Sequence, residues 1–341
     1  MFVEEIALYD RQIRLWGMAT QLRLRSAKIL LINLGAIGGE IIKNLVLGGL
    51  NSITILDDSK VKEEDFGAQF FLPNDESIVN QLKLPLVIEK IKELNNRVNL
   101  TIDTSSLTKV ISDSQYLKQF DLIIATELDK SQLFELNSKT RELNIPLYAT
   151  GGHGLNGYII TDLIKHTATS EKDVGNIPRK PDTKINRVKT ITNVSYNETD
   201  KKEIITILDE YNPISEIFKS KQLPNQLNKR QMKRLSAALP LIFALFEIPK
   251  PINVEDDIDI NLLKSTAISV CESFGIPSTI ITEEYLNIFS KQAFTEFSPV
   301  AAIIGGTLAQ DVIQFLSQKE SPINNVLILD SIKSEMPIYS L

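Results

Sequence analysis

Hydrophobic residues near the start of the chain form short continuous runs separated by amphipathic segments. Residues 28–33 and 52–57 are apolar runs of strand length, which is typical of strands buried on both faces of a parallel sheet. Between them, residues 40–47 place their apolar side chains on one helical stripe, and two glycines end that stripe. The order strand, glycine turn, helix, strand predicts a doubly wound α/β fold of the Rossmann type, with a mostly parallel sheet.

The same alternation continues to residue 165. It predicts two further helices and four further strands, at residues 78–94, 131–142, 98–103, 120–126, 145–149 and 157–161. Within the first of these helices, Pro85 is expected to interrupt or kink the backbone.

The middle of the chain has a different character. Residues 166–200 are polar and rich in Lys, Thr, Asp and Asn, and we interpret them as a loop or linker. Residues 203–246 have a mostly helical pattern, and the pattern predicts two more helices at 260–274 and 283–297.

The end of the chain returns to the alternation of apolar helices and strands seen before residue 165. Residues 298–316 predict a long apolar helix, and residues 325–330 predict a last strand. We therefore expect one α/β domain built from residues 1–165 and 285–341. Residues 166–284 would form a linker and a smaller, mainly helical insertion.

Composition narrows the classes of function. The 341 residues carry a formal net charge of −6 and include one cysteine, Cys271. The negative charge argues against a nucleic-acid surface, which is normally basic. A single cysteine excludes an intrachain disulfide and a CxxC zinc site, so we expect a reducing compartment. The first nine residues lack a signal-peptide pattern and the apolar stretches are short, so we expect no membrane contact.

The turn after the first predicted strand resembles a degenerate dinucleotide-binding motif. Where that motif reads G-x-G-x-x-G, this chain has Asn33, Gly35 and Gly38. Asn tolerates a positive φ angle, so the tight turn can survive. An acidic residue follows at the usual distance, as Asp57 or Asp58. A nicotinamide-dependent oxidoreductase and a turn that only packs strand against helix both remain open.

Several segments together resemble the enzymes that activate ubiquitin-like proteins and their bacterial adenylyltransferase relatives. The first is Tyr9-Asp-Arg-Gln-Ile-Arg-Leu-Trp-Gly17, which holds the chain's only Trp. The others are Gly67-Ala-Gln-Phe70, Ser298-Pro-Val-Ala-Ala-Ile-Ile-Gly-Gly-Thr-Leu-Ala-Gln310 and Asn324-Asn-Val-Leu-Ile-Leu-Asp330. Within this family, the chain is most similar to the smaller, non-catalytic subunits of SUMO-activating enzymes.

The resemblance implies a division of labour between two chains. A catalytic subunit binds ATP and Mg²⁺, adenylates the SUMO carboxyl terminus and then takes SUMO as a thioester. The smaller subunit lends one arginine to that ATP site, and the matching residue here is Arg11. The implied location is the nucleus, with the cytoplasm as a second location. A self-sufficient homodimeric adenylyltransferase and a regulatory subunit for another ubiquitin-like modifier are the alternatives.

This chain departs from the family's nucleotide-site pattern, which is D-x-D followed by N-x-x-R-Q-F. Asp57 and Ser59 stand at the two acidic positions, and Asp65 and Ala68 stand where Asn and Arg are expected. Asp58 is the neighbouring acid that could substitute at the position of Ser59. Its side chain, however, would point to the opposite face of an extended segment. The ribose-facing acid and the phosphate-facing arginine are thus missing.

Two further positions of the nucleotide site are doubtful. Lys83 falls at the place of the phosphate-binding lysine, but alone we interpret it as a solvated surface charge. Asp129 lies one position away from the magnesium-binding aspartate, with Gln132, Leu133 and Phe134 where an arginine should follow. We expect no tightly bound nucleotide or metal in this chain and regard Gly35, Gly38, Asp57 and Lys83 as vestigial.

The remaining reactive residues are interpreted as structural. Cys271 lies in an apolar helical context without a neighbouring base, so we expect a buried thiol. His153 and His166 have no metal-ligand spacing. A basic cluster is interpreted as a solvated helix face, with a nuclear address as the alternative, and it consists of Lys229, Arg230, Lys233 and Arg234.

Overall fold

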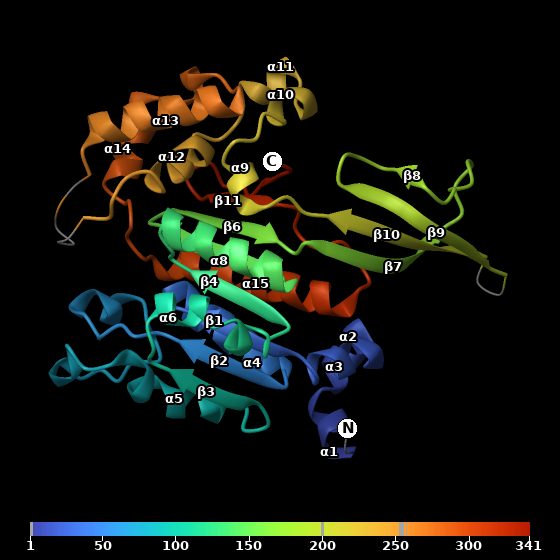
Figure 1. The fold of residues 1–341 in the computed structure, drawn as a ribbon, viewed down its shortest axis with the longest axis horizontal. Helices are drawn as coiled ribbons and strands as arrows, with labels where there is room; N and C mark the ends of the chain where they lie inside the picture. Colours follow the sequence, from blue (N-terminus) through green and yellow to red (C-terminus); the bar gives the residue numbers. More distant parts are fainter. Residues whose placement is uncertain (1–2, 199–200, 252–255, 257) are drawn as a thin grey trace.

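The computed structural model describes residues 3–198, 201–251, 256 and 258–341. Its centre is an eight-stranded sheet in the order β12-β11-β6-β5-β4-β1-β2-β3 (Figure 1). Five neighbouring strands are parallel, namely β1 (Lys28–Ile32), β2 (Ser52–Leu56), β3 (Asn99–Asp103), β4 (Leu122–Thr126) and β5 (Leu147–His153). The other three pair antiparallel, namely β6 (Asn156–Asp162), β11 (Val326–Asp330) and β12 (Ile338–Tyr339). The predicted doubly wound, mostly parallel sheet is confirmed.

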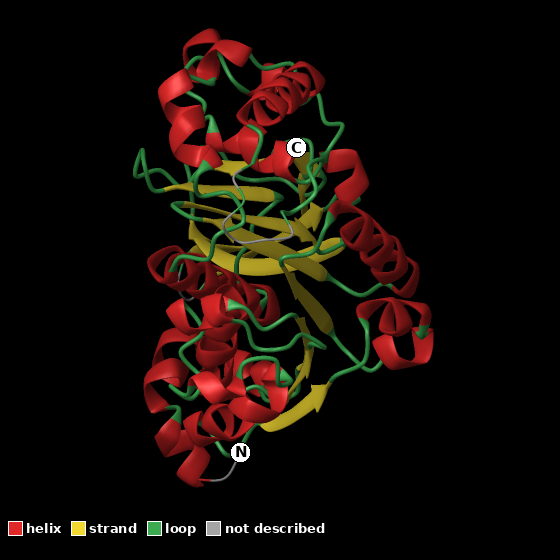
Figure 2. Cartoon of the chain, turned by 90° about the vertical axis from the view of Figure 1, so that its left-hand side faces the viewer, coloured by secondary structure: helices red, strands yellow, loops and turns green. Residues whose placement is uncertain are grey.

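Helices cover both faces of this sheet (Figure 2). One face carries α4 (Ala36–Gly48), α5 (Lys83–Leu94) and α15 (Ser298–Ser317). The other carries α6 (Leu107–Ser112), α7 (Ser114–Leu117), α8 (Lys130–Leu143), α12 (Ala238–Leu245), α13 (Ile260–Phe274) and α14 (Glu283–Ser290). A hydrophobic core lies between each helical layer and the sheet. Strand β1 contributes side chains to both cores, because successive strand side chains point to opposite faces. Leu31 lies in the first core and Leu30 in the second.

Short elements connect these layers. The amino-terminal segment forms α1 (Val3–Leu8), α2 (Asp10–Trp16) and α3 (Met18–Leu24). Three single 3₁₀ turns are η1 (Glu63–Gly67), η2 (Glu76–Ile78) and η3 (Ser278–Ile280). The helix predicted at 78–94 begins only at Lys83, so Pro85 lies in the first turn of α5, where its missing N–H breaks no helical hydrogen bond. The predicted interruption or kink inside the helix is therefore wrong.

The segment predicted as a loop or linker is instead a second, four-stranded antiparallel sheet. It contains β7 (Lys165–Asp173), β8 (Thr183–Lys184), β9 (Lys189–Asn197) and β10 (Lys202–Glu210). The helical prediction for the start of 203–246 is also wrong, because Lys202–Glu210 form strand β10 of this sheet. Strands β7, β8 and β9 are largely solvated and polar, so they lack the apolar runs of the central sheet. Strand β10 does carry apolar residues, between Ile204 and Leu208.

The helical part after this sheet does not have a core of its own. It contains three four-residue helices, α9 (Ile214–Ile217), α10 (Leu223–Gln226) and α11 (Lys229–Met232), followed by α12, α13 and α14. Phe243 of α12 and Phe274 of α13 belong to the same hydrophobic cluster as Leu30 and Ile123 of the central sheet. The helices at 214–290 therefore share one core with the strands.

Helix α15 corrects the expectation that every apolar stretch is too short to span a bilayer. By length and composition alone, its 20 residues are long and apolar enough. In this structure 56% of its apolar window is buried inside the protein, where the helix packs on α4 and on β6. It is a central helix of the first core.

Candidate functional site

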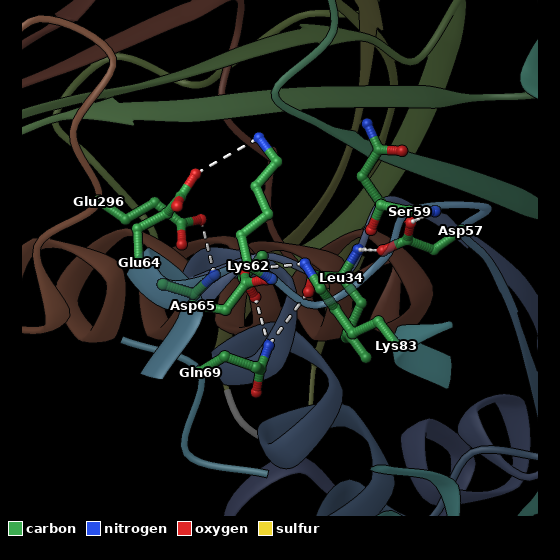
Figure 3. Close-up of polar contacts among 12 residues, drawn as sticks. Leu34, Asp57, Ser59, Lys62, Glu64, Asp65, Gln69, Lys83 and Glu296 are labelled. Atoms are coloured by element: carbon green, nitrogen blue, oxygen red, sulfur yellow. Dashed lines mark hydrogen bonds and ion pairs between the residues drawn. The ribbon is translucent and has the colours of Figure 1, made fainter. Parts of the chain in front are cut away.

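A cavity of about 420 Å³ opens at the carboxyl ends of β1, β2 and β4. Strands β2 and β4 leave β1 on opposite sides, and such a switch point is where open α/β sheets bind ligands. The cavity brings together six of the residues singled out from the sequence, and Figure 3 shows Asp57, Ser59, Asp65 and Lys83 among them. They are Asn33, Gly35, Asp57, Ser59, Asp65 and Lys83.

The turn after β1 keeps its tight geometry without the first glycine. Asn33 adopts a φ angle of 65°, as its side chain allows, and its Nδ2 donates to the carbonyl of Thr126 at 2.8 Å. Asp57 Oδ2 accepts the Leu34 N–H at 2.8 Å. Gly38 is required because a Cβ there would lie 2.7 Å from the Asn33 carbonyl oxygen. Asp57 thus supports the turn and is not free for a ribose.

The acidic residues Asp58 and Asp129 do not lie in the cavity lining. Asp58 is exposed and lies outside the cavity lining, as expected for the opposite face of an extended segment. Asp129 is also exposed and caps α8, where its side chain accepts the Gln132 N–H at 2.9 Å. Ala68 lines a separate small hollow beside Phe70.

Glu296, which the sequence did not suggest, occupies the glycine turn. Its Oε1 accepts the N–H of Ala36, the first residue of α4, at 2.8 Å (Figure 3). A Cβ on Gly35 would lie only 2.2 Å from this oxygen, so the carboxylate lies directly against the turn. The amino terminus of α4 therefore already holds a carboxyl group supplied by the chain itself. Burial raises the pKa of Glu296, and the hydrogen bond from Ala36 works in the opposite direction.

Lys83 is engaged as well. Its Nζ lies 2.9 Å from Asp65 Oδ1, and the two side chains are only 8% and 9% exposed. Asp65 Oδ2 also accepts the Lys62 N–H at 2.8 Å. Interpreting Lys83 as a surface charge is therefore wrong, because the residue that stands where the family has Asn draws it into a buried ion pair.

Replacing Lys83 tests this pair. Lys83→Met should lower the free energy of unfolding by about 2 kcal/mol, because the buried Asp65 carboxylate loses its charged partner. The double variant Asp65→Asn/Lys83→Met should recover most of that loss, as measured by urea unfolding. Equal stability of the single variant and the wild type would contradict a stabilising pair.

Glu127 is a second unexpected carboxyl group in the cavity. It lies just after β4 with a φ angle of 55°, and its Oε1 accepts the Gly152 N–H at 2.8 Å. Burial, and then the charge of Glu296, raise the pKa of Glu127 to about 8. A pKa of about 8 keeps Glu127 mostly protonated near neutral pH, so it adds its negative charge to the cavity only in alkaline solution.

The raised pKa of Glu127 predicts a pH-dependent stability. Between its unfolded value of 4.5 and about 8, the folded protein binds more protons at this group than the unfolded chain does. Stability contributed by Glu127 should therefore fall as pH rises through this window. Glu127→Gln removes the effect, so the variant should gain about 2 kcal/mol relative to wild type between pH 5 and pH 8. Thermal unfolding at several pH values measures this, and parallel pH profiles would refute it.

Arg11 lies far from this cavity, on the exposed side of α2. Helix α4 begins at the cavity, and its carboxyl end receives a hydrogen bond from Gln12 Nε2 to the Leu47 carbonyl at 3.4 Å. Thirteen helical residues span about 20 Å, so α2 lies at the end of α4 that is opposite the cavity. In Figure 1 the β2 arrow points left, away from α2 and α3. Arg11 is therefore placed outside the chain's own site.

Among the residues that the structure describes, none engages the side chain of Arg11. Within the described part of the chain, no hydrogen bond or ion pair involves its side chain. The neighbouring Asp10 pairs instead with Arg14 at 2.9 Å, one helical turn along. The guanidinium of Arg11 is thus available to another molecule.

The cysteine and the histidines lie outside the cavity lining. Cys271 is fully buried in α13, as expected, and burial raises the pKa of its thiol to about 11. His153 Nδ1 accepts the Phe294 N–H at 3.1 Å, and His166 Nε2 lies 3.0 Å from the Phe315 carbonyl oxygen. The described residues contain no group of three or more His, Cys, Asp or Glu arranged to hold a metal ion.

A family model called ThiF matches residues 9–341. The chain belongs to the ThiF family. Family membership favours an adenylation-type fold over the nicotinamide-dependent oxidoreductase that the degenerate turn left open. It also agrees with the segments in which the resemblance was found, which are distributed from the amino-terminal motif to the last long strand.

Relatives of this ThiF chain match it along almost its whole length. It is 41% identical to the DNA damage tolerance protein RHC31 of Saccharomyces cerevisiae, over 98% of this chain and 96% of the relative. It is 32% identical to the DNA damage tolerance protein rad31 of Schizosaccharomyces pombe, over 99% and 97%. It is also 29% identical to SUMO-activating enzyme subunit 1 of Homo sapiens, over 97% and 93%.

Proposed function

We propose that this chain is the non-catalytic subunit of a SUMO-activating enzyme. It pairs with the catalytic subunit and completes that subunit's ATP site, where SUMO is adenylated. The observation that carries the proposal is the position of Arg11, which is exposed, unengaged within the described residues and about 20 Å from the chain's own cavity. Relatives named SUMO-activating enzyme subunit 1 support the choice of modifier.

The chemistry of adenylation gives an arginine in trans a clear role. Attack of a carboxylate on the α-phosphate builds negative charge on the phosphate oxygens. A planar guanidinium can donate two parallel hydrogen bonds to such oxygens, which an ammonium group cannot do. Supplied by a second chain, it also makes the reaction depend on assembly of the two subunits.

ATP and Mg²⁺ are assigned to the catalytic subunit in this proposal. In this chain Glu296 occupies the amino terminus of α4, and Lys83 is held by Asp65. Neither the first N–H of α4 nor the ammonium group of Lys83 is therefore free to bind a triphosphate. The thioester is likewise assigned to the partner, because the buried Cys271 with its raised pKa cannot serve as a thiolate nucleophile.

The proposed location is the nucleus, and also the cytoplasm. The basic cluster of Lys229, Arg230, Lys233 and Arg234 is exposed on and beside α11. An exposed cluster of this kind is suited to a receptor with an acidic groove. Imaging a fluorescent fusion in which all four are replaced by Gln tests this assignment, which would fail if the nuclear signal were unchanged.

Exchange of labelled pyrophosphate into ATP tests the proposed function. The purified chain with SUMO should show no exchange, and addition of a catalytic subunit should restore it. Exchange by the chain alone would favour the self-sufficient homodimeric adenylyltransferase instead. Exchange that requires the partner but another ubiquitin-like modifier would change the assigned substrate.

A further inference from the structure

The cavity of this chain lies where nucleotides bind in folds of this type, but the charges of its lining side chains are unsuited to phosphates. Its lining includes the carboxyl groups of six residues and the ammonium groups of only four. Two of those lysines are already paired, Lys83 with Asp65 at 2.9 Å and Lys62 with Glu64 at 3.3 Å. A nucleotide's phosphates would therefore enter a cavity in which two of the four ammonium groups already have a carboxylate partner.

The position of Glu296 is the most specific feature. Its carboxylate accepts a hydrogen bond from Ala36, the first N–H of the 13-residue α4, and lies against Gly35. A phosphate bound in a turn of this type would use the same N–H and the same open space above the glycine. Two anions cannot share it, because one oxygen already lies 2.2 Å from the place of a Gly35 Cβ.

We propose that the Glu296 carboxylate takes the place of a nucleotide phosphate at the amino terminus of α4, and that this contact closes the chain's own cavity to nucleotides. The inference rests on the proposed function in one respect, because it explains why a chain with an intact turn would bind no ATP of its own. The absent family residues lower the affinity, whereas Glu296 occupies the site.

Isothermal titration of the purified full chain with inorganic pyrophosphate, without metal, tests the proposal. Glu296→Ala should bind pyrophosphate at least tenfold more tightly than the wild type. The matched control is Glu64→Ala, which removes one carboxylate from the same lining but has no contact with α4. The control should stay within about twofold of the wild type, since general electrostatics alone changes there.

A second measurement addresses the contact itself. Gly35→Ala should lower the melting temperature of the wild type, because the new Cβ would collide with Glu296 Oε1. The same change should cost much less in the Glu296→Ala background. If Glu296→Ala does not fold, Glu296→Ser decides the question, because its short side chain cannot reach the Ala36 N–H that Glu296 now occupies. A gain of at least tenfold in pyrophosphate affinity by this variant would support the proposal.

Three results would overturn the inference. They are equal pyrophosphate binding by the wild type and Glu296→Ala, an equal gain by Glu64→Ala, and no gain by either folded Glu296 variant. None of them bears on exchange by the two-subunit enzyme, which measures the proposed function separately. Loss of that exchange would in turn leave the titration result valid.

Discussion

Arg11→Ala is expected to lower ATP–pyrophosphate exchange about a thousandfold when this chain is combined with the catalytic subunit of a SUMO-activating enzyme. The guanidinium would meet charge that develops on the α-phosphate in the transition state, so its loss should lower the maximal exchange rate more than it weakens ATP binding. Arg11→Lys should recover little, because an ammonium group cannot form the paired hydrogen bonds.

Arg14→Ala is the matched control for this experiment. Arg14 lies on the same short helix and is also exposed, but it pairs with Asp10. An exposed ion pair of this kind contributes little to stability, so exchange should stay within about threefold of the wild type. Size-exclusion chromatography of each complex separates a catalytic defect from failed assembly. Unchanged exchange by an assembled Arg11→Ala complex would remove the arginine from the mechanism.

Phe243→Ala is expected to lower the free energy of unfolding by about 4 kcal/mol. The ring is 2% exposed and packs edge-on against Phe218 and Phe274, with centroids 4.7 and 5.0 Å away. Removing it leaves a cavity in the cluster that also contains Leu30 of β1. The loss should therefore be felt by the central sheet and not only by α12 and α13.

Urea unfolding followed by two probes distinguishes these possibilities. Fluorescence of Trp16, the only Trp, reports on the amino-terminal helices, whereas far-ultraviolet circular dichroism reports on the whole chain. A shared core predicts that both transitions shift together to lower urea. An independent helical insertion would instead give a fluorescence transition that stays at its wild-type midpoint. Phe120→Ala, in a partly exposed ring, provides a control with a smaller loss.

The central sheet could be predicted because its signal is local. Apolar runs such as 28–33 and 52–57 each identify a buried strand without reference to the rest of the chain. Strands β7, β8 and β9 of the second sheet were missed because they are largely solvated and polar, so no hydrophobic run distinguishes them from a loop. Strand β10 has an apolar run between Ile204 and Leu208, but a short run of this kind does not by itself distinguish a strand from a helix. There the pairing of β10 with its neighbours overrides the weak local pattern.

The sequence by itself determined the doubly wound sheet, the turn at Asn33 and the loss of the family's acid and arginine at Ser59 and Ala68. Only the tertiary structure decided how the cavity is filled. Glu296 and Ala36 are 260 positions apart, and Lys83 and Asp65 meet through the packing of α5 beside the segment after β2. The tertiary structure also placed Arg11 near the carboxyl end of α4, whereas the cavity lies at the amino end of that helix. Periodicity and turn chemistry are fixed within a few residues, whereas the partner of a buried charge depends on which distant segments pack together.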